Sequence, residues 1–282
     1  MIGSAFGRAI RLLAANPLLW IPGLAAGLFV AVDIVLQFTL GLFTAQRLFI
    51  LELVAMPFFM GGMLQVLGGD ARDSATFLKG MRENYFRIIL PLVIIVLAIL
   101  ITVILISIPV GLVTQGANIG LLGVAFFGSA IPIGFFTMFF DNVAVFERTK
   151  VFESIRRSVE VVLRNPGASL GFLFGSLIAG GIIVFGLMIA WTGILYDQLL
   201  PLTQLSPEEV QQITLESINQ LLGFEGILIT AALAFVGITL VFSILYTFKA
   251  TLFKAIAETT PGTSEVPAEG EFDSKGRWYK YT

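Results

Sequence analysis

Five ionisable side chains lie within or close to long apolar segments of this chain, where a charge is costly and often has a role. They are Asp33, Arg47, Glu52, Asp141 and Lys249. Charges of this kind usually meet an opposite charge or face a water-filled cavity. Their chemistry is therefore either an ion pair that stabilises the fold or a site for an ion or a ligand.

Three of these residues are grouped by their spacing. A reversal of the chain near residues 40–42 brings Asp33 and Arg47 to a similar depth, with Glu52 one helical turn deeper. Pairing is the least costly way to bury a charge. We therefore favour an ion pair between Asp33 and Arg47 over a ligand site.

The other two charges, Asp141 and Lys249, occupy equivalent positions when the last pair of apolar segments is superposed on the middle pair. A direct contact between them is one interpretation. Both also lie near segment ends, where a side chain reaches the headgroup region. Solvated charges without mutual contact are the favoured interpretation.

Two prolines in the middle of apolar segments mark a second candidate site, because each is followed by glycine and by paired phenylalanines. Proline removes a helical hydrogen bond, so both helices should kink at a matching depth. Paired breaks often border a binding site. The alternative is that the kinks only improve packing. The residues predicted to line one shared cavity are Pro57, Phe58, Phe59, Gly61, Pro132, Gly134, Phe135 and Phe136.

Catalytic signatures are missing from the sequence. It contains neither cysteine nor histidine, which excludes thiolate and imidazole chemistry and nearly every zinc site. Phosphate loops, nucleophile elbows and metal-ligand clusters are absent as well. With a net charge of −2, the chain also lacks a basic field for nucleic acid. We expect no enzyme activity, no catalytic residue, no cofactor, no metal and no nucleic-acid partner.

Apolar segments long enough to cross a bilayer must position these residues. Hydrophobic residues make up 57% of the 282 positions and charged residues 13%. A bilayer core needs about 20 apolar residues in a helix. The fold class is therefore an all-α integral membrane protein. Its six predicted transmembrane helices cover residues 18–43, 48–67, 88–113, 119–146, 168–191 and 226–248.

Lys and Arg indicate the orientation, since they are retained on the cytoplasmic side. In the six-helix arrangement, Arg47 alone among the 17 Lys and Arg residues falls on the opposite side. We expect a multi-pass protein of the cell membrane with both termini in the cytoplasm.

Amphipathic segments precede each predicted pair of spans. Phe6, Ala9, Ile10 and Leu13 share one helical face in the first, and similar patterns follow near residues 77–85 and 152–164. These patterns predict three hairpins, each preceded by an interfacial helix, in pseudo-repeats at about 4–69, 70–147 and 148–257. The basic residues assigned to the interfacial helices are Arg8, Arg11, Lys79, Arg82, Arg156, Arg157 and Arg164.

Two regions outside these units are distinctive. Ser206-Pro-Glu-Glu209 has the pattern of a helix start, which predicts an acidic outer helix over about 206–220. The polar tail 258–282 is predicted to be disordered, so that 1–257 forms a single transmembrane domain.

Three stretches together carry a family resemblance: Pro57-Phe-Phe-Met-Gly-Gly62, Phe77-Leu-Lys-Gly with Asn84-Tyr85, and Glu153-Ser-Ile-Arg-Arg-Ser158 with Arg164-Asn165-Pro166. Through them the chain resembles a family of uncharacterised archaeal membrane proteins. That family is itself distantly similar to the membrane domain of some glycerophosphodiester phosphodiesterases. The resemblance implies the architecture but no activity, because the soluble phosphodiesterase domain has no counterpart among these residues.

We therefore expect a non-enzymatic membrane protein, either a scaffold, a transport accessory or a lipid-handling protein. The alternative is a small secondary transporter or channel with a midplane cavity between the first two hairpins. That alternative needs a watery path to Asp33, Glu52 or Asp141. The expected partners are membrane lipids and, secondarily, another membrane protein.

Overall fold

The computed structural model describes residues 1–69, 71, 73–114, 119–204, 206, 214–257, 270–272 and 278–280. Six of its helices are long and apolar enough to cross a membrane, which confirms the number predicted from the sequence. These spans are Pro17–Leu40, Arg47–Gly68, Ser74–Pro109, Gly123–Phe146, Pro166–Ile194 and Glu216–Ala257.

Helices account for almost all of the described chain. In order they are α1 (Ile2–Ala15), η1 (Pro17–Trp20), α2 (Ile21–Leu40), α3 (Leu42–Gly68), α4 (Ser74–Thr114), α5 (Ile119–Phe136), α6 (Phe140–Phe146), α7 (Val151–Arg164), α8 (Pro166–Ile194), α9 (Tyr196–Leu199), η2 (Leu200–Gln204) and α11 (Leu215–Ala257). In the tail, β1 (Gly270–Phe272) pairs antiparallel with β2 (Trp278–Lys280). The prediction of disorder for the remaining tail falls outside the described residues.

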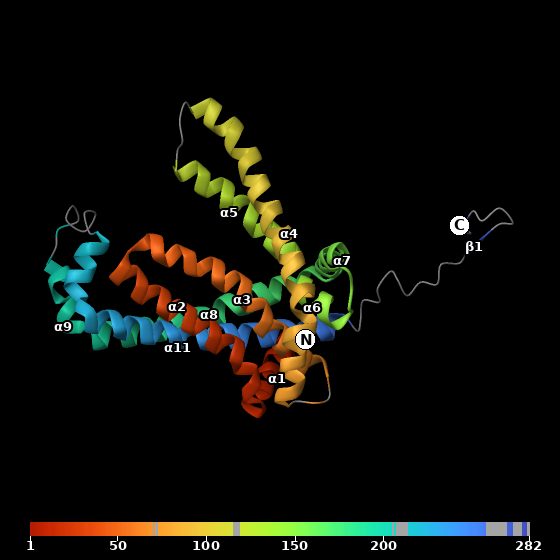
Figure 1. Cartoon of the computed structure of the whole chain (residues 1–282), viewed down its shortest axis with the longest axis horizontal. Coiled ribbons are helices and arrows are strands. Elements are labelled where there is room, and N and C mark those ends of the chain that lie inside the picture. Colours follow the sequence, from red (N-terminus) through yellow and green to blue (C-terminus); the bar gives the residue numbers. More distant parts are fainter. Residues whose placement is uncertain are drawn as a thin grey trace.

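Long helices pack across the predicted units as well as within them. The most extensive packing joins α2 to α11 and α3 to α4, while α8 lies on α11 and α5 lies on α4. The α4–α5 pair leans away from the other long helices (Figure 1). Helices α1, α6 and α7 gather at one end, opposite α9 and the turn between α2 and α3 (Figure 1). We call the end that holds α1, α6 and α7 the basic end.

Helix α1 packs against the bundle through small side chains. Ala5, Ala9 and Leu13 are buried, whereas Ile10 on the predicted apolar face is 40% exposed. The helix ends at Asn16, whose Oδ1 accepts a hydrogen bond of 3.0 Å from the Leu18 N–H and so caps η1. Pro17 follows at the first position of η1, where its missing N–H is harmless. This junction turns the chain from α1 into the first span.

The second predicted amphipathic segment is not a separate helix. Residues 77–85 belong to α4, which runs without a break for 41 residues, or about 60 Å. The helix starts at Asp73, whose Oδ1 accepts a hydrogen bond of 2.8 Å from the Thr76 N–H. Hydrogen bonds from Thr76 also lower the pKa of Asp73. No glycine or proline interrupts residues 81–90, so the span simply extends the first turns.

Span four is broken one turn after Pro132. Helix α5 ends at Phe136 and α6 begins at Phe140. Ser158 of α7 holds the break closed: its Oγ accepts from the Phe139 N–H and donates to the Phe136 carbonyl, both at 3.1 Å. By contrast, α3 continues through Pro57 as one helix. Span four is therefore interrupted next to its proline, whereas α3 is not interrupted at Pro57, and the predicted kink at Pro57 stays a prediction.

Glycines allow α2 to approach α11 closely. A Cβ added at Gly27 would lie 2.5 Å from Thr239 Oγ1 and 2.6 Å from the Phe235 carbonyl oxygen. One added at Gly23 would overlap the hydroxyl of Ser243. The glycine pair thus has the packing role typical of small residues at membrane helix interfaces.

The acidic outer helix predicted over 206–220 includes residues 207–213, which lie outside the described residues. The part that is described begins after Thr214, whose Oγ1 accepts a hydrogen bond of 3.2 Å from the Ser217 N–H. Helix α11 then bends at Gly223, whose φ of 61° lies in the region that glycine tolerates best.

Candidate functional site at the basic end

A network of ion pairs connects α7 to the end of α6. Arg157 is only 6% exposed, and its Nε lies 3.2 Å from Glu147 Oε2. Its NH1 lies 3.3 Å from Glu160 Oε2, and Glu160 Oε1 lies 2.7 Å from Arg164 NH2. Arg157, predicted as an interfacial cation, is therefore buried by contacts with other parts of the protein and not exposed on its helix. Glu160 and Arg164 are four residues apart, the spacing at which side chains meet on one side of a helix.

Helix α7 has a buried side and an exposed side. Ser154, Ser158 and Val161 are buried against the protein together with Arg157. On the exposed side Phe152 is 74% exposed and Leu163 is 61% exposed. Arg156 lies next to them and pairs at 3.3 Å with Glu153, which belongs to a neighbouring charged strip with Arg164. An exposed apolar face beside a charged face is the pattern of a helix at a membrane interface.

Asp141 is the centre of a second buried cluster. Its Oδ2 lies 2.6 Å from Lys249 Nζ and accepts a hydrogen bond of 2.6 Å from the Tyr246 hydroxyl. Asn142 donates to Oδ1 from its backbone and its side chain, at 2.9 and 3.0 Å. Asp141 itself is fully buried. The favoured prediction of separate solvated charges is therefore wrong, and the direct contact is present.

The three charges near the first reversal of the chain differ in their exposure. Asp33 and Glu52 are half-buried, whereas Arg47 is exposed. This difference in exposure does not test an ion pair between Asp33 and Arg47. The predicted pairing therefore stays a prediction.

Around Pro57, the helices are closely packed. Phe58 stacks on Tyr85 of α4 with ring centres 3.8 Å apart, and Phe59 is half-buried. A Cβ at Gly61 would lie 3.0 Å from the Gly80 carbonyl oxygen. Helix α4 thus fills the space that Gly61 was predicted to leave open.

The residues around Pro132, unlike those around Pro57, include exposed positions. Pro132 and Gly134 are exposed, and nothing lies within 4 Å of a Cβ placed at Gly134. Phe135 packs beside the core, and Phe136 is 36% exposed. The pocket that reaches Pro132 is lined by residues of α5 alone, and Pro57 is not among them.

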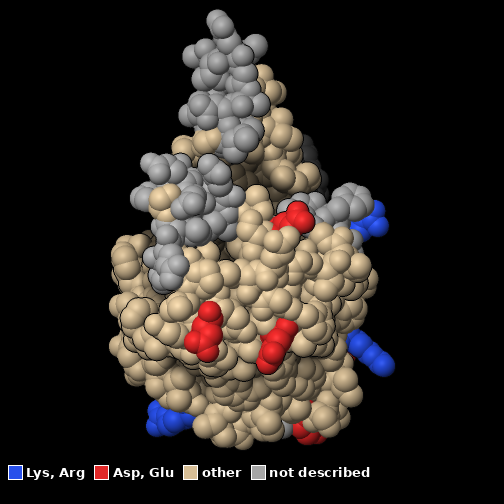
Figure 2. All heavy atoms as spheres, turned by 90° about the vertical axis from the view of Figure 1, so that its left-hand side faces the viewer, with Lys and Arg blue, Asp and Glu red and all other residues tan. Residues whose placement is uncertain are grey.

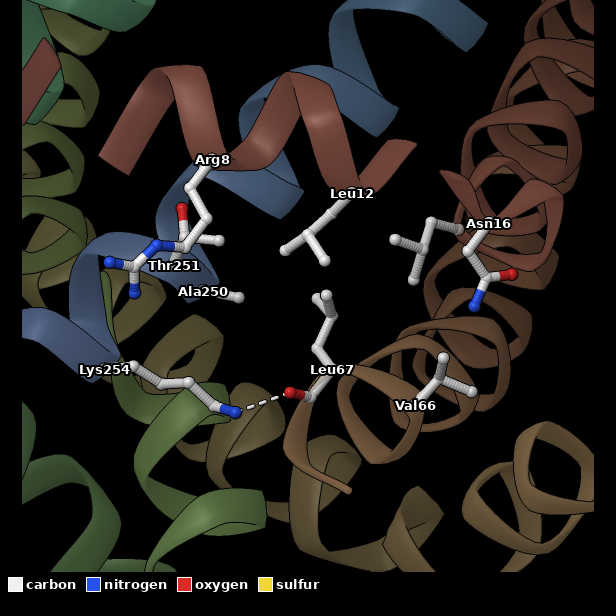
Figure 3. Close-up of a pocket in the computed structure, with 9 residues that line it drawn as sticks. Arg8, Leu12, Asn16, Val66, Leu67, Ala250, Thr251 and Lys254 are labelled. Carbon is white, nitrogen blue, oxygen red and sulfur yellow. Dashed lines mark hydrogen bonds between the residues drawn. The ribbon is translucent and has the colours of Figure 1, made fainter. Parts of the chain in front are cut away.

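A cavity that the sequence did not indicate lies between α1, the end of α3 and α11 (Figure 3). Its volume is about 180 Å³. Arg8 and Lys254 contribute two cations to one side, and Asn16 lies on the opposite side (Figure 3). The other lining residues are Leu12, Leu19, Val66, Leu67, Ala250 and Thr251. Arg8 was predicted from the sequence as an interfacial cation, but its neighbours come from three separate helices.

Lys254 is fixed by two contacts that sequence reasoning missed. Its Nζ donates to the Leu67 carbonyl in the last turn of α3, and it lies 5.1 Å from the centre of the Phe146 ring. A cation at a helix C-terminus interacts favourably with the helix dipole and with the free carbonyls there.

Charge is distributed unevenly over the two ends. The predicted interfacial cations other than Arg157 are exposed; these are Arg8, Arg11, Lys79, Arg82, Arg156 and Arg164. Figure 2 looks at the end that holds α9 and shows mostly uncharged residues, with a few acidic side chains near the middle and basic ones at the margins.

Six apolar helices, with charged networks between them, define an integral membrane protein that crosses the bilayer several times. Within this class, the chain belongs to the family described as Domain of unknown function (DUF7847), whose model matches residues 1–256. No curated protein and no solved structure matches the chain. The expected similarity to archaeal proteins and to the membrane domain of phosphodiesterases is not shown by this match.

Proposed function

We propose that the protein is a non-enzymatic membrane scaffold that handles anionic lipid at one leaflet through its basic end. The observation that carries the proposal is the amphipathic helix α7. Its buried side is held to the protein by Arg157, and its exposed side carries Phe152 and Leu163 next to the cations Arg156 and Arg164. A helix of this kind lies with its apolar face among acyl chains and its cations at the headgroups.

Exposed cations on other elements extend this surface. Arg8 and Arg11 on α1 and Lys79 and Arg82 on α4 all belong to the segments that flank the spans at this end. The charge bias assigns this end to the cytoplasmic leaflet of the cell membrane, with both termini inside. Anionic lipids of that leaflet attract juxtamembrane Lys and Arg by about 1 kcal/mol each.

Enzymatic or transport roles find less support. The two oxygens of Asp141 are bonded by Lys249, Tyr246 and Asn142, which suits a fixed structural pair. The pocket at Pro132 is lined by α5 alone, so it gives no support to a midplane transport cavity between two hairpins.

The position of α7 can be tested because the chain contains no cysteine. Phe152→Cys and Glu153→Cys variants would each carry an environment-sensitive fluorophore in nanodiscs containing brominated phosphatidylcholine or brominated phosphatidylglycerol. We expect strong quenching at residue 152 and weak quenching at residue 153, because adjacent residues lie about 100° apart around a helix. We also expect stronger quenching by phosphatidylglycerol. Equal quenching at both positions, or no preference between lipids, would contradict the proposal.

A further inference from the structure

The cavity between α1, α3 and α11 combines positive charge with an unsatisfied donor. Asn16 is 4% exposed, and its Nδ2 has no hydrogen-bond partner among the described residues. Its Oδ1 is already occupied by the Leu18 N–H, which fixes the amide so that Nδ2 faces the cavity wall formed by Val66 (Figure 3). An unpaired buried N–H donor destabilises a protein, so an oxygen acceptor at this point would be favourable.

The side chain of Arg8 is also available to bind a ligand. Within the described part of the chain its guanidinium makes no ion pair or hydrogen bond, and Figure 3 shows it directed along the cavity wall toward Lys254. None of the nine residues lining the cavity is acidic. The two cations among these lining residues create a positive field that favours a bound anion.

Size and position also fit a headgroup. A volume of about 180 Å³ is the space of about six water molecules at ~30 Å³ each. The cavity lies at the last turn of α3 and beside α1, the level at which the first span begins. Leu12, Leu19 and Leu67 supply an apolar wall next to the charged one.

We propose that this cavity binds the phosphate of an anionic lipid headgroup, with Arg8 and Lys254 as cations and the Asn16 amide as a donor to another oxygen of the same headgroup. The forked guanidinium of arginine suits phosphate oxygens. The choice of a lipid as the source of the phosphate rests on the proposed function. The phosphate chemistry itself rests on the cavity.

The test uses the full chain, delipidated in neutral detergent, and follows its thermal unfolding midpoint while ligand is added. The ligands are dihexanoyl phosphatidic acid, dihexanoyl phosphatidylcholine and inorganic phosphate, at matched ionic strength. A ligand that binds only the folded state raises the midpoint in proportion to its occupancy, which yields an apparent Kd. We expect stabilisation by phosphatidic acid that exceeds both other ligands.

Three variants make the test specific. Arg8→Gln should raise the Kd for phosphatidic acid at least about tenfold. Lys150→Gln removes an exposed cation that lies outside the cavity, so it is the matched control and should leave the Kd unchanged. Asn16→Asp keeps the Oδ1 that caps η1 but replaces the donor by an anionic oxygen that repels phosphate, so it should weaken binding.

Each outcome decides the question. Equal stabilisation by inorganic phosphate, lost in Arg8→Gln, would support the phosphate site and overturn the lipid assignment. Equal binding of phosphatidylcholine, or unchanged binding by both Arg8→Gln and Asn16→Asp, would overturn the site. The quenching experiment at residue 152 does not depend on Arg8, so failure of the cavity and failure of the proposed function are distinguishable.

Discussion

Asp141 Oδ2 and Lys249 Nζ lie 2.6 Å apart and join the end of span four to the last span. The carboxylate is fully buried, and Lys249 also lies 4.4 Å from the centre of the Tyr246 ring. A buried pair of this kind does not require net stabilisation to be important. Loss of one partner leaves the other charge buried and uncompensated.

Asp141→Ala and Lys249→Ala should each lower the free energy of unfolding by about 3–5 kcal/mol. The double change Asp141→Leu with Lys249→Met should recover much of this loss, because no charge then remains without a partner. Denaturant unfolding in mixed micelles measures all three variants. Glu83→Ala, which removes the exposed pair with Lys79, is the control and should change stability by about 0–1 kcal/mol. Additive effects of the single changes would argue against a coupled pair.

Gly61→Leu should destabilise the protein strongly, whereas Gly134→Leu should be tolerated. The first side chain would be forced against Gly80 and Asn84 of α4, while the second would project into open space. Heat stability in detergent, measured from the fraction that remains monodisperse, compares the two. Equal losses would show that Gly134 also borders occupied space, which would contradict the open surroundings of that residue.

Ser158→Ala should destabilise the break between α5 and α6 by about 1–3 kcal/mol, since it leaves the Phe139 N–H without its partner. Ser154→Ala in the same helix is a suitable control: Ser154 Oγ donates only to the Val151 carbonyl within α7. Hydrogen exchange at residues 137–140, followed by mass spectrometry, should accelerate in the first variant alone. Unchanged exchange would mean that the break does not depend on Ser158.

The charge bias predicts that α1 and α7 lie inside the cell. Cysteines at Gly3 and Glu153 should be protected from an impermeant thiol reagent in whole cells, while cysteines at Asp197 and Ser206 should react. Permeabilised cells supply the control in which all four positions are labelled. Labelling of residue 153 from outside would reverse the assigned orientation.

The length of apolar runs was sufficient to predict the six spans, because a bilayer imposes one length scale on every crossing helix. It could not predict what buried charges contact. Arg157 has the i,i+4 spacing of a surface pair with Glu153, yet it is buried with Glu147, a partner fixed by the turn between α6 and α7. Asp141 was correctly aligned with Lys249, but Tyr246 and Asn142 complete its hydrogen bonding and make burial tolerable.

The two prolines also show that the sequence does not predict which contacts a segment makes. Pro57 and Pro132 have similar neighbours in the sequence, but the helix continues through Pro57 and ends one turn after Pro132. The difference lies in α7, whose Ser158 bonds the freed backbone of span four. The cavity at Arg8 and Asn16 was equally out of reach, because its walls come from opposite ends of the chain.

The close approach of Gly23 and Gly27 to Thr239 and Ser243 joins the first span to the last. During synthesis α2 enters the membrane early, and the helix that it packs against emerges from the ribosome only when nearly the whole chain has been made. Until then its glycine face must be covered by lipid or by an insertion factor. Chains truncated before α11 would expose that face permanently, which offers a quality-control protease a structural mark by which to recognise unfinished copies.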